Sequence, residues 1–256
     1  MDDTQRLRYS RHLLLDDWSE HTQERLLASH ALVIGAGGLG APALMYLASS
    51  GVGHLTVVDP DVVELSNLQR QVLHTTDRVG QTKVASAQAG VAALNPELRF
   101  TPMAQAADAA LLDALLPGVD VVLDGTDRFD TRQMINQACV RHGKPLVSAS
   151  AIRMDAQLAV FDARQSDSPC YACVFPPDAP PPEERCATLG VFAPLVGAIG
   201  VMQAGQAIRL LAGLSEGTPL HGRLLMLDGR TWETHSVRVR KSPHCPVCGP
   251  VKRLEP

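Results

Sequence analysis

The apolar run Ala31-Leu-Val-Ile34 is followed at once by Gly35-Ala-Gly-Gly-Leu-Gly40 and then by a helix-compatible stretch, residues 41–50. An apolar run that ends at glycine predicts a buried strand, and the glycines permit a tight turn and close approach to a phosphate. The following helix would present free N–H groups and the positive end of its dipole to an anion. Taken alone, this GxGxxG pattern fits NAD, FAD, S-adenosylmethionine or ATP.

Strand and helix signals alternate as far as residue 162. Strands are expected over residues 54–59, 98–103, 119–124, 145–150 and 157–162, and helices over residues 83–94 and 106–116, with a third ending at 142. This order predicts an α/β fold, with a Rossmann-like, mostly parallel sheet that carries helices on both faces. Residues 224–228 and 235–240 predict a C-terminal antiparallel extension.

A chain of 256 residues, 45% of them hydrophobic, can form one domain around a full core. We divide it into a helical segment (1–30), a nucleotide-binding part (31–165) and a C-terminal part (166–256). The proline-rich loop at 175–187 is either a surface linker or a mobile segment that crosses a site. The apolar stretch 191–202 is too short to span a bilayer, so we expect a buried or dimer-facing helix.

Composition excludes several classes of partner. The formal net charge is −4, which gives no basic surface for nucleic acid. The polar first residues lack the apolar core of a signal peptide, and nothing predicts contact with a membrane. A cytoplasmic location follows as an expectation.

Four of the six cysteines form two CxxC pairs, Cys170-Tyr-Ala-Cys173 and Cys245-Pro-Val-Cys248. Without an export signal, such pairs indicate zinc rather than disulfides. A closed four-sulfur site leaves no open coordination position, so the zinc would be structural and would pin the chain end near Cys170. The alternative is four ordinary buried thiols.

Residues after the glycine loop suggest a triphosphate with a metal ion. Asp59 ends the second strand, 24 residues after Gly35, and suits a bidentate contact to ribose hydroxyls; otherwise it is a solvated strand-end acid. Arg70 and Lys83 follow as a candidate phosphate clamp, although each could be an ordinary surface cation. Asp127 could hold Mg²⁺.

Other residues near this site receive plainer interpretations. Of Asp124 and Asp130, one is expected to cap a helix. His74 and the histidines at 142, 221 and 244 have no ligand spacing and are expected to be surface or half-buried residues. The chain contains no GxxxxGK[ST] motif, which excludes a P-loop site.

Together these motifs resemble the ThiF/MoeB/HesA family of E1-like enzymes, which adenylate small ubiquitin-fold sulfur-carrier proteins. The resemblance runs from about residue 7 to 249. The residues that carry it are Arg8-Tyr-Ser-Arg11, the glycine loop, Asp59, Ser66-Asn-Leu-Gln-Arg70, Lys83, Asp124-Gly-Thr-Asp127, Cys186 and the two CxxC pairs.

The resemblance implies ATP, Mg²⁺ and Zn²⁺ as cofactors. The residues that it implies for ATP and magnesium are Gly38, Asp59, Ser66, Asn67, Arg70, Lys83 and Asp127. Arg11 would reach the ATP of the neighbouring subunit of a homodimer. Cys186 either joins covalently to the carrier or is a plain thiol. Three positions depart from the usual pattern: His12 replaces Gln, Gly125 replaces Cys and Arg128 replaces Asn, so we leave Arg128 out of the binding set.

The implied reaction joins the carrier's C-terminal glycine to AMP and releases pyrophosphate, before a thiocarboxylate forms. Residues 151–154 and 80–83 favour the molybdopterin carrier, whereas 15–17 and 228–229 favour the thiamine carrier. No sulfurtransferase domain follows Pro256, so we expect a separate sulfur donor. The competing classes are an NAD-dependent oxidoreductase, which needs neither Arg70 nor Lys83, and a nucleotide-binding scaffold without catalysis.

Overall fold

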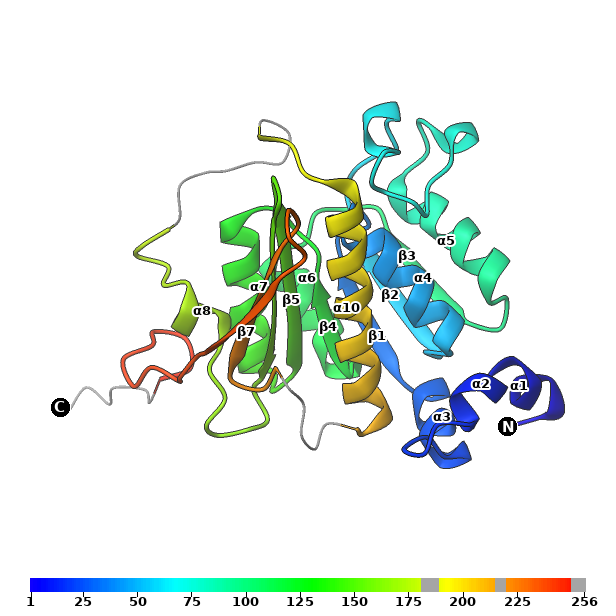
Figure 1. Cartoon of the computed structure of the whole chain (residues 1–256), viewed down its shortest axis with the longest axis horizontal. Coiled ribbons are helices and arrows are strands. Elements are labelled where there is room, and N and C mark those ends of the chain that lie inside the picture. The colour runs from blue at the N-terminus through cyan, green and yellow to red at the C-terminus, as the bar shows by residue number, and fades with distance from the viewer. Residues whose placement is uncertain (181–188, 215–219, 250–256) are drawn as a thin grey trace.

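The computed structural model describes residues 1–180, 189–214 and 220–249, and its centre is one eight-stranded sheet (Figure 1). The strand order is β3-β2-β1-β4-β5-β6-β7-β8. The strands are β1 (His30–Ile34), β2 (His54–Val58), β3 (Arg99–Met103), β4 (Val121–Asp124), β5 (Pro145–Ile152), β6 (Asp155–Asp162), β7 (Arg223–Asp228) and β8 (Thr234–Arg238). The first five are parallel and the last three pair antiparallel, which confirms the predicted fold class.

Helices cover both faces of the parallel part of the sheet. The α-helices of the described residues are α1 (Asp3–Arg8), α2 (Ser10–Leu13), α3 (Glu20–Leu27), α4 (Gly40–Ser50), α5 (Lys83–Leu94), α6 (Ala109–Leu115), α7 (Phe129–Arg141), α8 (Tyr171–Val174) and α10 (Ala193–Ala212). One buried cluster joins α3, α4, α5 and α10 to one face, and a second joins α6 and α7 to the other.

Strand β1 shows why this sequence forms a sheet that is buried on both sides. Ala31 and Val33 belong to the cluster under α4 and α10, whereas Leu32 and Ile34 belong to the cluster under α6 and α7. Successive side chains of a strand point to opposite faces, so a strand that is covered on both faces must be apolar at every position. The uninterrupted run Ala31-Leu-Val-Ile34 meets that condition.

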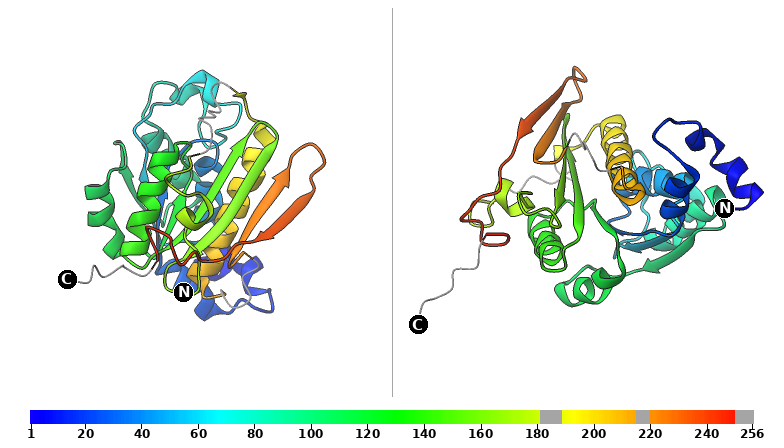
Figure 2. Two further views of the ribbon diagram at one scale, coloured as in Figure 1. Left: turned by 90° about the vertical axis from the view of Figure 1, so that its left-hand side faces the viewer. Right: turned by 90° about the horizontal axis from the view of Figure 1, so that it is seen from below.

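Helix α10 lies against α4 and the sheet (Figure 2). Its 20 residues are long and apolar enough to cross a membrane by length and composition, yet Leu195, Ile199 and Ala204 lie in the core. A Cβ on Gly200 would come within 2.6 Å of the carbonyl oxygen of Leu39, so glycine allows α10 to cross close to the glycine loop. Of the two alternatives expected for this helix, buried or dimer-facing, the structure shows that more than half of its apolar window, 56%, is buried within the chain.

Several element boundaries differ from the predictions; for example, β5 continues to Ile152 and β6 begins at Asp155. Helix α6 begins at Ala109, not 106, because the Asp108 carboxylate accepts the N–H of Leu111 at 2.8 Å and caps the helix there. The last strand ends at Arg238 rather than 240. Of the proline-rich segment, residues 181–188 lie outside the described part of the chain.

Two histidines stack at the start of β1 and β2, at the edge opposite the glycine loop. The rings of His30 and His54 lie 3.7 Å apart, and their Nε2 atoms are within hydrogen-bond distance of the hydroxyls of Thr56 and Thr101. Burial lowers the pKa of both rings, and that of His54 falls to about 4. At neutral pH, both rings are therefore uncharged in the folded protein.

This pair predicts a loss of stability in mild acid. Unfolding returns His54 to the ordinary histidine pKa of 6.5, so the unfolded chain binds more protons between about pH 6.5 and pH 4. The free energy of unfolding should therefore fall as the pH is lowered through that window. Urea titrations of wild type and His54→Gln measure it; an equally steep fall in the variant would contradict this origin.

Candidate active site

A cavity of about 470 Å³ opens at the carboxyl ends of β1, β2 and β4. Ligands of open α/β sheets bind at this edge, where the chain crosses to opposite sides of the first strand. The glycine loop, the end of β2 and the segment after β4 form its walls. The expected ATP residues that line it are Gly38, Asp59, Asn67, Arg70, Lys83 and Asp127.

The glycine loop is held by close backbone contacts. Gly35 has φ +95°, and a Cβ on Gly40 would lie 1.9 Å from the carbonyl oxygen of Gly35. Neither position therefore accepts another residue without moving the loop. Gly125 approaches from the end of β4, where a Cβ would lie 3.3 Å from the Gly40 nitrogen. A side chain at 125 would have to fit into this contact between the two loops.

The Asp59 carboxylate joins the end of β2 to the glycine loop. One oxygen accepts the N–H of Ala36 at 2.7 Å, and the other accepts the N–H of Asp61 at 2.9 Å. The side chain is only 4% exposed, so it is not a solvated strand-end acid. A carboxylate has about four acceptor positions, which leaves room for ribose hydroxyls beside these two bonds.

Lys83 is not a free cation. Its Nζ lies 2.7 Å from the carboxylate of Asp61, and its own N–H donates to the Asp61 carbonyl at 2.8 Å. The lysine side chain is 8% exposed and the aspartate side chain is 63% exposed. A buried ammonium needs such a partner, and Asp61 also fixes where the first turn of α5 begins. Sequence reasoning missed this pairing.

The segment after β2 brings further polar groups to the rim. Arg70 donates to the carbonyl of Ser66 at 3.2 Å, and the side chain of Asn67 accepts the N–H of Glu64 at 3.3 Å. Ser66 does not line the cavity; its hydroxyl donates to the carboxylate of Glu64 at 3.2 Å. Gln71, which sequence reasoning also missed, lines the cavity and is buried, and its Oε1 atom has no hydrogen-bond partner among the described residues.

The two aspartates of Asp124-Gly-Thr-Asp127 have different surroundings. Asp124 is fully buried and accepts hydrogen bonds from the N–H and hydroxyl of Thr126 and from the Ser148 hydroxyl. Asp127 is exposed at the cavity and has no hydrogen bond or ion pair with any described residue. Its carboxylate is therefore available to a metal ion.

The expectation of a helix cap at Asp124 or Asp130 is wrong. The residue at the cap position of α7 is Arg128, which makes no side-chain capping bond. Asp124 is instead committed to the turn after β4, and Asp130 lies in the first turn of α7. The expectation for His74 is also wrong, because this side chain is only 5% exposed.

Arg11 does not line the cavity of its own chain. It lies on α2, and this end of the chain packs near the C-terminal ends of α4 and α5. There Gln23 donates to the Ser50 carbonyl, and Asn95 donates to the Tyr9 hydroxyl. Lys83 begins α5, whose 12 residues place its two ends about 18 Å apart. Cys186 lies outside the described residues.

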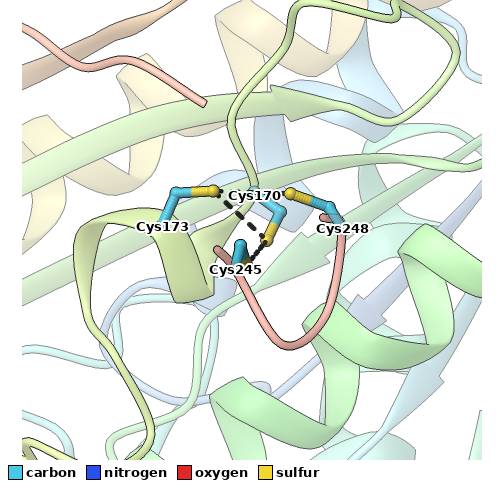
Figure 3. Close-up of side chains that lie close together, drawn as sticks. All are labelled: Cys170, Cys173, Cys245 and Cys248. Carbon is cyan, nitrogen blue, oxygen red and sulfur yellow. Dashed lines mark hydrogen bonds between the residues drawn. The ribbon is translucent and has the colours of Figure 1, made fainter. Parts of the chain in front are cut away.

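The four paired cysteines form one cluster away from the cavity. Their sulfur atoms point toward one another and lie within 4.8 Å (Figure 3). The separations are 3.6 Å for Cys170–Cys245, 3.4 Å for Cys173–Cys248 and 3.9 Å for Cys170–Cys173. A tetrahedral ion with metal–sulfur bonds of about 2.3 Å needs sulfurs about 3.8 Å apart. The cluster can therefore hold a metal with little rearrangement.

Comparison with known proteins decides the family. The ThiF family model matches residues 9–247. The chain belongs to the ThiF family. A SAMP-activating enzyme E1 of Haloferax volcanii is 46% identical over 97% of this chain and 91% of its own length. The Escherichia coli ThiS adenylyltransferase is 44% identical over 97% of both chains. The Escherichia coli molybdopterin-synthase adenylyltransferase is 43% identical over 97% of this chain and 98% of its own.

Solved structures agree on the architecture. Escherichia coli MccB, in a complex with succinimide, matches with a TM-score of 0.82 and 24% identity over 95% of this chain and 74% of that one. This likeness shows the fold alone. The sequence relatives of this ThiF-family chain are named as adenylyltransferases and an E1 enzyme, and the chain is an enzyme of that class. The resemblance inferred from its motifs is confirmed.

Asp59 and Asp127 should respond differently to the loss of charge. An amide at position 59 has one acceptor atom for two buried N–H donors, so Asp59→Asn should lower the free energy of unfolding by about 1–3 kcal/mol. Asp127→Asn removes no such bond and should stay within about 0.5 kcal/mol of wild type. Urea unfolding checks both values; equal stability losses would contradict the assignment of Asp59 to the loop.

Proposed function

We propose that this enzyme adenylates the C-terminal glycine of a small ubiquitin-fold sulfur carrier. The observation that carries the proposal is a cavity that joins the glycine loop and the buried Asp59 to cations and to the unpaired Asp127. Among the described residues that line it there is no serine, cysteine or histidine. A site built for phosphate and metal, whose described lining holds no serine, cysteine or histidine, suits a reaction in which the substrate supplies the attacking group.

The carrier's terminal carboxylate would be that group. Its ordinary pKa is roughly 3.5, so it is ionised at neutral pH and needs no general base. The protein has to align it with the α-phosphorus of ATP and to stabilise the departing pyrophosphate. Arg70 and Lys83 would contact the phosphates, and Asp127 would hold Mg²⁺, which offsets phosphate charge when bound. The products are an acyl-adenylate and pyrophosphate.

Charge in the cavity supports the need for further cations. Of the described residues that line it, four are basic and three are acidic, so they contribute one net positive charge. Lys83 is already paired with Asp61, and Arg132 donates to the carbonyl of Thr126. The negative charge of a triphosphate exceeds the net positive charge of these side chains. A metal ion and a cation from a second chain could both supply the positive charge that is missing. A nicotinamide dinucleotide would leave Asp127 without a role.

The test is ATP–pyrophosphate exchange with one purified carrier at a time. We expect exchange only with a carrier that has a free Gly-Gly terminus, because the described residues that line the site include no serine, cysteine or histidine that could attack ATP in its place. A carrier without its last glycine is the matched control. Exchange at the same rate without any carrier, or tighter binding of NAD than of ATP, would contradict the proposal.

We propose the molybdopterin carrier as the preferred substrate, with the thiamine carrier as its competitor. The support is the sequence at residues 151–154 and 80–83. Identities of 44% and 43% to the two Escherichia coli adenylyltransferases do not separate these pathways, so both carriers belong in the exchange assay. A separate sulfurtransferase would then convert the acyl-adenylate to a thiocarboxylate, in the cytoplasm.

We propose zinc as the ion of the cysteine cluster. Four sulfur atoms at distances that suit tetrahedral coordination favour zinc. A hydrogen bond from the Cys170 thiol lowers the pKa of Cys173, in the direction that a thiolate ligand requires. The cluster ties α8 to the segment after β8 (Figure 3). Its role would be structural, because no coordination position is left for a substrate.

Loss of one ligand should therefore reduce zinc content and stability together, because binding energy at such a site is folding energy. Cys248→Ser should retain less than one zinc per chain and unfold at a lower temperature. Cys139→Ser, a change to a buried cysteine outside the cluster, is the control and should retain its zinc. Metal analysis of freshly purified wild type that finds no zinc would contradict the proposal.

We propose that Arg11 completes the neighbouring subunit's site in a homodimer. Helix α2 lies near the C-terminal end of α5, whereas the cavity lies at its N-terminal end, about 18 Å away. The Arg11 side chain is too short to reach the cavity of its own chain. The side chain makes no ion pair or hydrogen bond with any described residue, so it is available to a partner. It would supply the cation that the cavity lacks.

Mixing two inactive variants tests this arrangement. Arg11→Ala and Asp127→Ala homodimers should each be nearly inactive. After subunit exchange, half of the dimers are mixed and each has one intact site of two, so activity should return to roughly a quarter of wild type. A tag on one variant verifies the exchange. Exchange without recovered activity would show that Arg11 does not act across the interface.

A further inference from the structure

The imidazole of His74 joins three segments that reach the cavity. Its Nε2 lies 2.9 Å from the carbonyl oxygen of Ala36 in the glycine loop, and its Nδ1 lies 2.9 Å from the hydroxyl of Ser86 on α5. His74 itself belongs to the segment that carries Arg70, and its backbone N–H donates to the Gln71 carbonyl. Each of the three segments also contributes a residue that lines the cavity: Gly37, Arg70 and Lys83, respectively, from the glycine loop, the segment after β2 and α5.

The partners fix the protonation state of the ring. A carbonyl oxygen only accepts, so Nε2 carries a proton and donates it to Ala36. The unprotonated Nδ1 then accepts the hydroxyl hydrogen of Ser86. Burial lowers the pKa of His74, and the cations of Lys83 and Arg78 lower it further, so the ring is neutral at neutral pH. One neutral ring thus acts as donor to one segment and as acceptor from another.

The Ala36 residue is consequently held from two sides. Its N–H donates to Asp59, and its carbonyl accepts from His74. In a trans peptide the N–H of the next residue points opposite to that carbonyl, so His74 directs the N–H of Gly37 away from itself. Gly37 lines the cavity, and its N–H and that of Gly38 have no hydrogen-bond partner among the described residues. Such N–H groups are phosphate donors.

We propose that His74 is a positioning residue for ATP, which holds the glycine loop, the Arg70 segment and the start of α5 in one arrangement. The inference rests on the proposed use of ATP in this cavity. The ring touches no reacting atom in this role. It fixes the direction of the Gly37 N–H and the spacing between the loop and Lys83 before the nucleotide arrives, which reduces the ordering that binding would otherwise require.

The test measures binding of magnesium with α,β-methylene-ATP by titration calorimetry, below the unfolding temperature of every variant. His74→Leu leaves the Ala36 carbonyl without its donor and should weaken binding at least roughly tenfold. His74→Gln can place an amide donor near the Nε2 position and should stay within about threefold of wild type. His54→Leu removes a histidine–hydroxyl bond at the opposite edge of the sheet and should leave binding unchanged, whatever its stability.

Each outcome has a definite meaning. Binding by His74→Leu within about twofold of wild type would overturn the inference, as would an equal loss in His54→Leu at matched loss of stability. If His74→Leu does not fold, Ser86→Ala decides instead: it should weaken binding at least roughly threefold, and wild-type affinity would overturn the inference. If the wild type itself bound no nucleotide analogue, the proposed function would be wrong, and this inference with it.

Discussion

The close contact between the turn after β1 and the turn after β4 is the constraint on which the site depends. The N–H of Gly125 donates to the carbonyl of Ile34 at 2.9 Å, and a Cβ on Gly35 would lie 2.9 Å from the Gly125 carbonyl. In the sheet, β2 lies on one side of β1 and β4 lies on the other, so the connections from these strands run in opposite directions. An opening forms between the connections at the carboxyl ends of the strands. The backbone contact below that opening closes the floor of the cavity.

Much of this arrangement could be predicted from the sequence because it follows from local patterns. The apolar run before Gly35 marked the central strand, the acids after later strands marked one edge of the sheet, and the CxxC pairs marked the cluster that the structure assembles. Parallel strands bring their carboxyl ends together, so Asp59 and Asp127 had to reach the same edge. These inferences needed no knowledge of loop paths.

The remaining contacts of the site could not be predicted because they depend on the paths of segments that lack a regular hydrophobic pattern. Residues 59–82 contain two 3₁₀ helices of three residues each and no α-helix or strand. The sequence therefore did not reveal that Lys83 returns to Asp61 or that His74 reaches Ala36. Asp124 was misjudged for a similar reason. Its partners Thr126 and Ser148 come from a turn and a neighbouring strand, and only the register of β4 with β5 brings Ser148 to it.

In the proposed reaction, a carrier carboxylate attacks the α-phosphorus of ATP in this cavity without help from a protein nucleophile. Transfer of an oxygen isotope tests it most directly. A carrier with ¹⁸O in its terminal carboxylate is incubated with enzyme and ATP, and a thiol then releases the nucleotide. Attack by the carrier carboxylate should place ¹⁸O in AMP and none in pyrophosphate. Label in orthophosphate, or AMP without label, would contradict it.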